Sequence, residues 1–76
     1  MEIRMKAFNE TKQVVGFAAY RVNLFNSGWG NFRWLTQNGG YGNRNMDIDQ
    51  MTKLMVRRAR QWAKLGYTIA QEAHNV

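Results

Sequence analysis

The residues of this chain best suited to chemistry are basic and recur with helical spacing. They lie 4, 3 and 4 residues apart and are Lys53, Arg57, Arg60 and Lys64. Residues three or four apart are neighbours on a helix, so these four share one narrow face, with Arg58 on its flank. No acidic residue lies between Gln50 and Gln71 to offset the repulsion among them. The pattern indicates either a solvated helix face or a surface that binds an acidic partner.

A second set of candidate binding residues lies between positions 26 and 45. It mixes aromatic and arginine side chains among Gly and Asn, and its members are Trp29, Phe32, Arg33, Trp34, Tyr41 and Arg44. Aromatic rings beside Arg can stack on nucleobases, and the same residue types dominate the centres of protein interfaces. We expect Phe32 and Trp34 to fill the core. We expect Trp29 and Tyr41, on a turn and a loop, to be exposed and to form a binding surface with the two Arg side chains.

Catalytic chemistry has little support in the sequence. The chain has no Cys, a single Ser at Ser27 and a single His at His74, whereas a nucleophilic triad needs three groups within mutual reach. The close carboxylates Asp47 and Asp49 are better explained as the start of a helix. The Gly-rich segment matches neither common phosphate-binding motif. We therefore predict a protein that is not an enzyme and that binds no metal, cofactor or small-molecule substrate.

The overall charge favours acidic partners. Eleven Lys and Arg against five Asp and Glu give a formal net charge of +6, which attracts nucleic acid, an acidic protein surface or an anionic membrane. No apolar run approaches the roughly 20 residues of a membrane span, and residues 1–6 do not resemble a signal peptide. Because the absence of Cys fits a reducing compartment, we expect a cytoplasmic protein of a bacterial cell, without membrane binding.

One long amphipathic helix is expected to position the basic residues. Asp47 is a suitable N-cap with Gln50 three residues later, Lys64 suits the last turn, and Gly66 is a typical helix stop. Five apolar residues of this segment fall on one narrow face, namely Ile48, Met51, Met55, Ala59 and Trp62, with Val56 and Ala63 on one flank and Leu54 and Leu65 on the other. That face lies nearly opposite the basic residues, so the helix is expected to turn one side to the core and the other to a partner.

The remainder of the chain predicts strands and turns. The expected strands cover residues 2–8, 13–25, 31–37 and, as a short last strand, 67–71, because polar and apolar residues alternate there. A helix over residues 12–20 is the alternative for part of the second strand. Asn26, Ser27 and Gly28 predict a turn, residues 38–45 predict a flexible loop, and residues 72–76 predict a flexible tail.

These elements predict a single α+β domain over residues 1–76. It contains a small antiparallel sheet of three, possibly four, strands packed against one long amphipathic C-terminal helix, in the order ββ(β)α(β). A chain of 76 residues buries only about 60% of its unfolded surface, so its core is small. Pairing of two copies in a homodimer is therefore plausible.

Two functions from different classes fit this sequence. The first is a non-catalytic interaction protein that docks on a larger, acidic protein and inhibits or modulates it, in the manner of small accessory proteins of phages and mobile elements. The alternative is a nucleic-acid-binding module without sequence preference, in which the basic helix face and the Arg-aromatic segment contact phosphates and bases. The two hypotheses share the same candidate residues.

Overall fold

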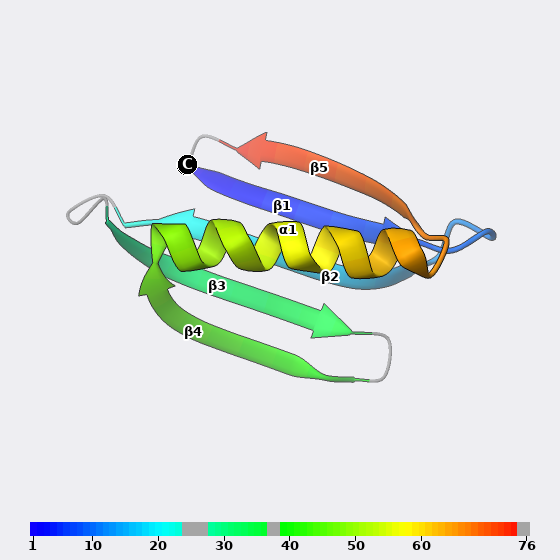
Figure 1. Ribbon diagram of the computed structural model, residues 1–76, viewed down its shortest axis with the longest axis horizontal. Helices are drawn as coiled ribbons and strands as arrows, with labels where there is room; N and C mark the ends of the chain where they lie inside the picture. The colour runs from blue at the N-terminus through cyan, green and yellow to red at the C-terminus, as the bar shows by residue number, and fades with distance from the viewer. Residues whose placement is uncertain (24–27, 37–38, 75–76) are drawn as a thin grey trace.

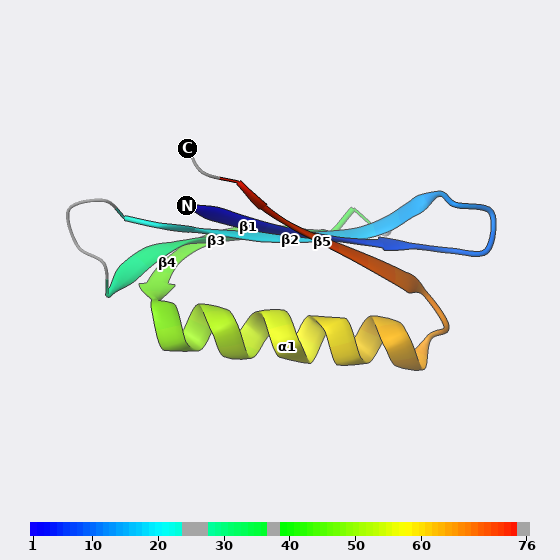
Figure 2. The same ribbon diagram turned by 90° about the horizontal axis from the view of Figure 1, so that it is seen from above.

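The computed structural model describes residues 1–23, 28–36 and 39–74, which form five strands and one helix (Figure 1). In chain order the elements are β1 (Glu2–Phe8), β2 (Val14–Val22), β3 (Trp29–Thr36), β4 (Tyr41–Asp47), α1 (Ile48–Lys64) and β5 (Thr68–His74). The strands form one sheet in the order β4-β3-β2-β1-β5, with antiparallel neighbours throughout. Helix α1 lies along one face of this sheet (Figure 2). The α+β class is as predicted.

The strand count was underestimated, because the segment predicted as a flexible loop contains most of β4. Tyr41–Asp47 pairs with β3 over its whole length, from Leu35 opposite Tyr41 to Trp29 opposite Asp47. Its Gly and Asn residues have low strand propensity. The strand nevertheless forms at the sheet edge, where the side-chain amide of Asn31 in β3 donates to the side-chain oxygens of Asn43 and Asn45. Pairing with β3 thus overrides local propensity.

The helix is not C-terminal, because it is followed by β5, which overlaps the short last strand predicted over residues 67–71. This strand runs from Thr68 to His74 and pairs with β1 along its full length. Residues 72–74, which were predicted to belong to a flexible tail, are therefore part of the sheet. Without β5, strand β1 would present a row of unpaired backbone groups at the sheet edge. Positions 75 and 76 lie outside the described residues.

The other strands lie close to their predicted positions. β1 has the predicted bounds, and β2 confirms a strand rather than a helix over residues 14–20. β3 begins at Trp29, two residues before the predicted start. Asn26 and Ser27, in the predicted turn, and residues 24–25, at the predicted end of the second strand, lie outside the described residues.

Helix α1 begins and ends where the sequence indicates. The side-chain Oδ1 atom of Asp47 accepts a hydrogen bond of 2.8 Å from the backbone N–H of Gln50, and Asp49 lies in the first turn, where its charge suits the helix dipole. Lys64 lies in the last turn. Gly66 adopts a φ of +82°, a left-handed conformation that ends the helix and that glycine tolerates best.

The core lies between α1 and one face of the sheet. Met51, Met55 and Trp62 of the helix are buried. They pack with sheet residues that share the same face, namely Met5, Ala7, Val15, Ala18, Phe32 and Met46. As predicted, Phe32 is buried and Trp34 is packed against this core. We call the opposite side of the sheet, which α1 does not cover (Figure 2), the open face.

Two tryptophan rings lie directly against glycine backbones on the helix side. A Cβ atom at Gly42 would lie 1.8 Å from Cζ2 of Trp34, and one at Gly16 would lie 2.6 Å from Cζ2 of Trp62. Distances this short are not compatible with a side chain unless the ring moves. Glycine at these positions therefore sets how closely the two rings approach the sheet.

The contact between Gly42 and Trp34 predicts a specific loss of stability. Alanine normally suits a strand better than glycine by about 0.5–1 kcal/mol. We expect Gly42→Ala instead to lower the free energy of unfolding by about 1–3 kcal/mol, because the Trp34 ring must move out of a packed position. Urea denaturation followed by circular dichroism measures this change. In a Trp34→Leu background the same substitution should cost much less, and an equal cost in both backgrounds would contradict the packing described.

Candidate functional site

The outward face of α1 carries four exposed cations. Lys53, Arg57, Arg60 and Lys64, called the basic row below, all lie on the solvent side of the helix. Asp49 precedes Lys53 by one helical turn. Among the described residues, however, no ion pair is found for Asp49 or for any member of the basic row. The row therefore presents its positive charge without an ion pair to any described residue.

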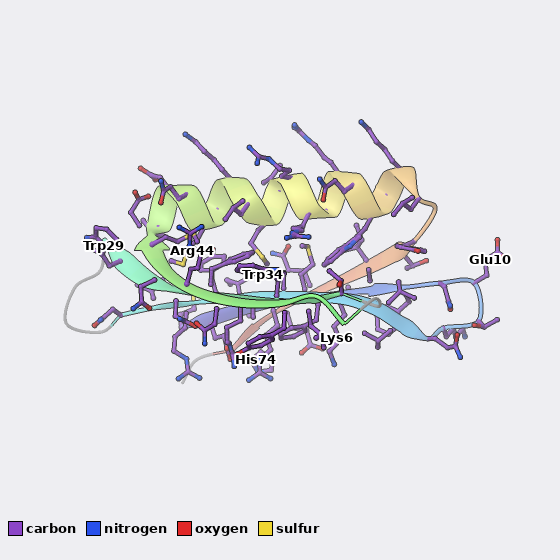
Figure 3. The ribbon with its side chains drawn as sticks, turned by 90° about the horizontal axis from the view of Figure 1, so that it is seen from below. Lys6, Glu10, Trp29, Trp34, Arg44 and His74 are labelled. Carbon is purple, nitrogen blue, oxygen red and sulfur yellow. The ribbon has the colours of Figure 1, made fainter. Side chains whose placement is uncertain are left out.

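Arg44 extends the basic row onto the sheet. It is exposed on β4 and lies on the helix side of the sheet, close to the start of α1 (Figure 3). Between Arg44 and the helix lies a shallow hollow of about 470 Å³. Its apolar lining comes from Trp29, Met46 and Leu54, and its cationic lining comes from Arg44, Lys53 and Arg57. Trp29 is 50% exposed, in agreement with the prediction that it is accessible.

A second apolar site, in addition to the hollow beside Arg44, lies farther along the helix among the basic side chains. Val56 is 45% exposed on the outer face of the helix. It lines a shallow depression together with Lys53, Arg57, Arg60 and Lys64. The basic row thus combines charge with accessible apolar surface at two places along its length.

Arg58 contributes to packing more than to this outer surface. Its guanidinium carbon lies 5.9 Å from the centroid of the Trp34 ring, within the range of a cation–π contact. The centroid of the Trp34 ring lies in turn 5.6 Å from that of the buried Phe32 ring. Arg58 therefore helps to hold Trp34 in place. Arg58 itself is half-buried and is not aligned with the basic row.

Arg33 and Tyr41 lie on the open face, away from the basic row and Arg44. Successive strand residues point to opposite sides of a sheet. Arg33 is paired with Ala19 and Asn43, and Tyr41 is paired with Leu35, all at open-face positions. Tyr41 is 68% exposed, in agreement with its predicted accessibility. The candidate residues from the sequence thus divide between two surfaces on opposite sides of the molecule.

The open face groups Arg33 with three charged residues that the sequence did not single out. Glu2 is completely buried, although the helix does not cover this side. Its Oε2 atom accepts from Nε of Arg4 at 2.9 Å and lies 2.8 Å from Nη2 of the same residue. Its Oε1 atom accepts from Nη2 of Arg33 at 2.5 Å, and Nη2 of Arg21 lies 3.9 Å from Oε2. We call these four residues the arginine cluster.

The charge balance of the arginine cluster remains positive. Burial raises the pKa of the Glu2 carboxyl, but the hydrogen bond from Arg4 and the charges of Arg4, Arg33 and Arg21 outweigh burial and lower that pKa below its usual 4.5. Glu2 is therefore a carboxylate at neutral pH. One carboxylate faces three guanidinium groups, whose side chains are 42%, 56% and 41% exposed for Arg4, Arg21 and Arg33. The cluster can attract a further anion from solvent.

The sequence indicates only part of the arginine cluster. Glu2 and Arg4 are two residues apart and so share a face of β1, which the predicted alternation already implied. Arg21 and Arg33 are distant in sequence and join Glu2 only through the register of β1 with β2 and of β2 with β3.

The part of the chain that the structure describes contains no candidate metal site and no candidate membrane-spanning helix. No group of three or more His, Cys, Asp or Glu residues is placed to hold a metal ion there. Within the same residues, no helix combines the length and apolar character needed to cross a bilayer. No protein-family model, no curated protein and no solved structure matched this chain. What the two surfaces can bind must therefore be inferred from their side chains, charges and shape.

The arginine cluster predicts a pH-dependent contribution to stability. We expect Glu2→Gln to lower the free energy of unfolding at neutral pH by about 1–3 kcal/mol, because three guanidinium groups lose their only counter-charge in the cluster. Since the pKa of Glu2 is lower in the folded protein than in the unfolded chain, this contribution is present above about pH 4.5 and is lost as the pH falls through the folded value. Denaturation of both proteins at several pH values measures it.

The difference between wild type and Glu2→Gln should accordingly shrink on acidification. Glu10→Gln is a matched control, because Glu10 is an exposed carboxylate in the turn between β1 and β2. It should change stability little at any pH. A difference between wild type and Glu2→Gln that stays constant from neutral pH to about pH 3 would contradict the ionised, stabilising carboxylate.

Proposed function

We propose that this protein is a non-catalytic interaction protein that docks on an acidic surface of a larger protein and inhibits or modulates it. The observation that carries this proposal is the basic row, joined by Arg44. These five exposed cations lie on one side of the molecule, and none of them forms an ion pair with another described residue.

Electrostatics supports an acidic partner for this face. Like charges three or four residues apart on a helix are destabilising by a few tenths of a kcal/mol per pair. An acidic partner relieves that repulsion and also speeds the diffusional encounter. Arg57, Arg60 and Arg44 suit carboxylates in particular, because a guanidinium can donate two parallel hydrogen bonds to one carboxylate. From Lys53 to Lys64 the row extends about 17 Å along the helix axis, given the rise of 1.5 Å per residue.

The apolar surface beside the basic row and Arg44 favours a protein partner over nucleic acid. The hollow beside Trp29, with Met46 and Leu54 in its lining, and the exposed Val56 provide sites for apolar side chains. Aromatic, Met and Arg residues are enriched at the centres of protein interfaces. Contacts to a phosphate backbone depend on charge and do not involve apolar sites of this kind. Binding of duplex nucleic acid by the basic row remains the alternative, and the same experiments decide it.

Removing charge from the basic row should weaken binding to an acidic polypeptide. We expect Arg57→Gln/Arg60→Gln to lower the affinity for poly-L-glutamate at least about tenfold at low salt, because the loss of several close ion pairs removes more than about 1.4 kcal/mol. Isothermal titration calorimetry measures the affinity. The matched control is Lys6→Gln/Lys12→Gln, which removes two exposed cations outside the helix and gives the same net charge.

The control should reduce the affinity no more than about threefold, through the lower net charge alone. Equal losses in the two double variants would contradict a defined site on α1. Tighter binding of a duplex oligonucleotide than of poly-L-glutamate, lost in Arg57→Gln/Arg60→Gln, would replace the acidic protein with nucleic acid as the partner of the basic row.

The hollow beside Trp29 predicts a preference for acidic ligands that also carry aromatic groups. A random copolymer of glutamate and tyrosine should bind more tightly than poly-L-glutamate, because tyrosine rings can enter the hollow. Trp29→Ala should remove most of this preference while leaving the binding of poly-L-glutamate nearly unchanged. Tyr41→Ala is the control, since it removes an exposed aromatic ring from the opposite side. A preference that survives Trp29→Ala would contradict a role for the hollow.

A further inference from the structure

The open face arranges its side chains in rows that cross the strands. The first row is mainly apolar and runs through Lys6, Phe17, Leu35 and Tyr41. The second row runs through Glu72, Arg4, Ala19, Arg33 and Asn43, of which two are basic and one is acidic. The third row runs through Glu2, Arg21, Asn31 and Asn45. Neighbouring rows are two residues, or about 7 Å, apart along each strand.

The first row offers accessible ring and aliphatic surface. Tyr41 is 68% exposed and Leu35 is 48% exposed, and Phe17 beside Leu35 is partly exposed. Flat aromatic side chains on an uncovered sheet can stack against other flat groups. Lys6 adds a cation to the same row and lies on the side of the sheet away from α1 (Figure 3).

The second and third rows offer cations held in fixed positions. Glu2 holds Arg4 and Arg33 by hydrogen bonds. Arg21 lies 3.9 Å from the same carboxylate, which is too far for a hydrogen bond, so its N–H donors can turn to a ligand. A guanidinium pairs well with phosphate oxygens in a bidentate geometry. Among the described residues of β1, β2, β3 and β5, the open face has four cations and the two carboxylates of Glu2 and Glu72, and Glu72 contacts His74 at 2.9 Å.

A hollow at the end of the open face brings the polar and aromatic groups together. It has a volume of about 520 Å³ and its lining includes Arg21, Trp29, Asn31 and Asn45, of which Trp29 and Asn45 also line the hollow beside Arg44. This volume is in the range of small-ligand sites. Asn31 donates to Asn43 and Asn45 through its side-chain amide. The amide groups of Asn43 and Asn45 retain N–H donors that suit the edge of a nucleobase.

We propose that the open face is a second binding surface and that its ligand is single-stranded nucleic acid. Arg21, with Arg4 and Arg33, contacts phosphates, and Tyr41 and Phe17 stack against bases. A nucleotide joins an anionic phosphate to a flat base, which is the combination that these adjacent rows accept. A single strand is the form that fits, because the bases of a duplex are stacked inside and cannot reach aromatic side chains on a sheet. This surface is distinct from the basic row, on the other side of the molecule.

Charge argues against a second copy of this chain as the occupant. Two open faces packed about an axis near the arginine cluster would bring one positively charged cluster against another. Like charges juxtaposed at an interface cost several kcal/mol. An anionic polymer instead neutralises the excess charge of Arg4, Arg21 and Arg33.

Fluorescence anisotropy with a labelled oligothymidylate tests this proposal. We expect binding at low salt that weakens as salt rises, because phosphate contacts release counterions. Arg21→Gln and Tyr41→Ala should each lower the affinity at least about fivefold, while Tyr41→Phe should keep most of it because the stacking ring remains. Arg57→Gln is the matched control for Arg21→Gln, since it removes the same charge from the other side of the molecule, and it should reduce the affinity less than about twofold.

Several outcomes would overturn the proposal. These are an absence of oligothymidylate binding at low salt, wild-type affinity in both Arg21→Gln and Tyr41→Ala, or an equal loss in Arg57→Gln and Arg21→Gln. Failure here is distinguishable from failure of the proposed function, because binding of poly-L-glutamate is expected to depend on Arg57 and Arg60 and not on Tyr41.

Discussion

One helix can cover only one side of a five-stranded sheet, and the rest of this structure depends on that constraint. Met51, Met55 and Trp62 bury the helix side of the sheet. The other side remains open to solvent, so its residues must be polar, be paired with one another or contact a partner. The chain meets this requirement with the arginine cluster at one end of the open face and exposed ring and aliphatic side chains at the other. The molecule thereby acquires two basic surfaces of different character.

The difference between these surfaces lies in how their cations are held. On the open face, the buried carboxylate of Glu2 fixes the guanidinium groups of Arg4 and Arg33. In the basic row, the cations lie at the ends of long side chains. These side chains form no ion pair among the described residues, so they can change rotamer to fit a partner. A fixed cluster suits a repeating ligand such as a phosphate backbone, because less side-chain entropy is lost on binding. A row of long, exposed side chains suits the irregular carboxylate positions of a protein surface.

The sequence predicted the elements that local patterns determine and missed those that pairing determines. The apolar period of α1, its Asp47 cap and Gly66 stop, and the alternation in β1 were sufficient to place both elements. β4 could not be predicted in this way, because Gly42 and Asn43 have low strand propensity and the strand depends on β3 and on the contact of Gly42 with Trp34. The candidate residues were located only in part for the same reason. Helical spacing aligned the basic row, whereas Arg33 and Tyr41 could be assigned to the open face only once the strand register was known.

The two proposals together give this chain two binding surfaces, one on α1 and one on the open face of the sheet. Chemical-shift mapping of the ¹⁵N-labelled protein tests this account most directly, with poly-L-glutamate and oligothymidylate titrated into separate samples. The account predicts that poly-L-glutamate shifts the amides of α1 and of Arg44, and that oligothymidylate shifts those of open-face residues in β1 to β4, including Arg21 and Tyr41. Shifts at the same set of amides with both ligands would contradict it and would indicate a single polyanion-binding surface.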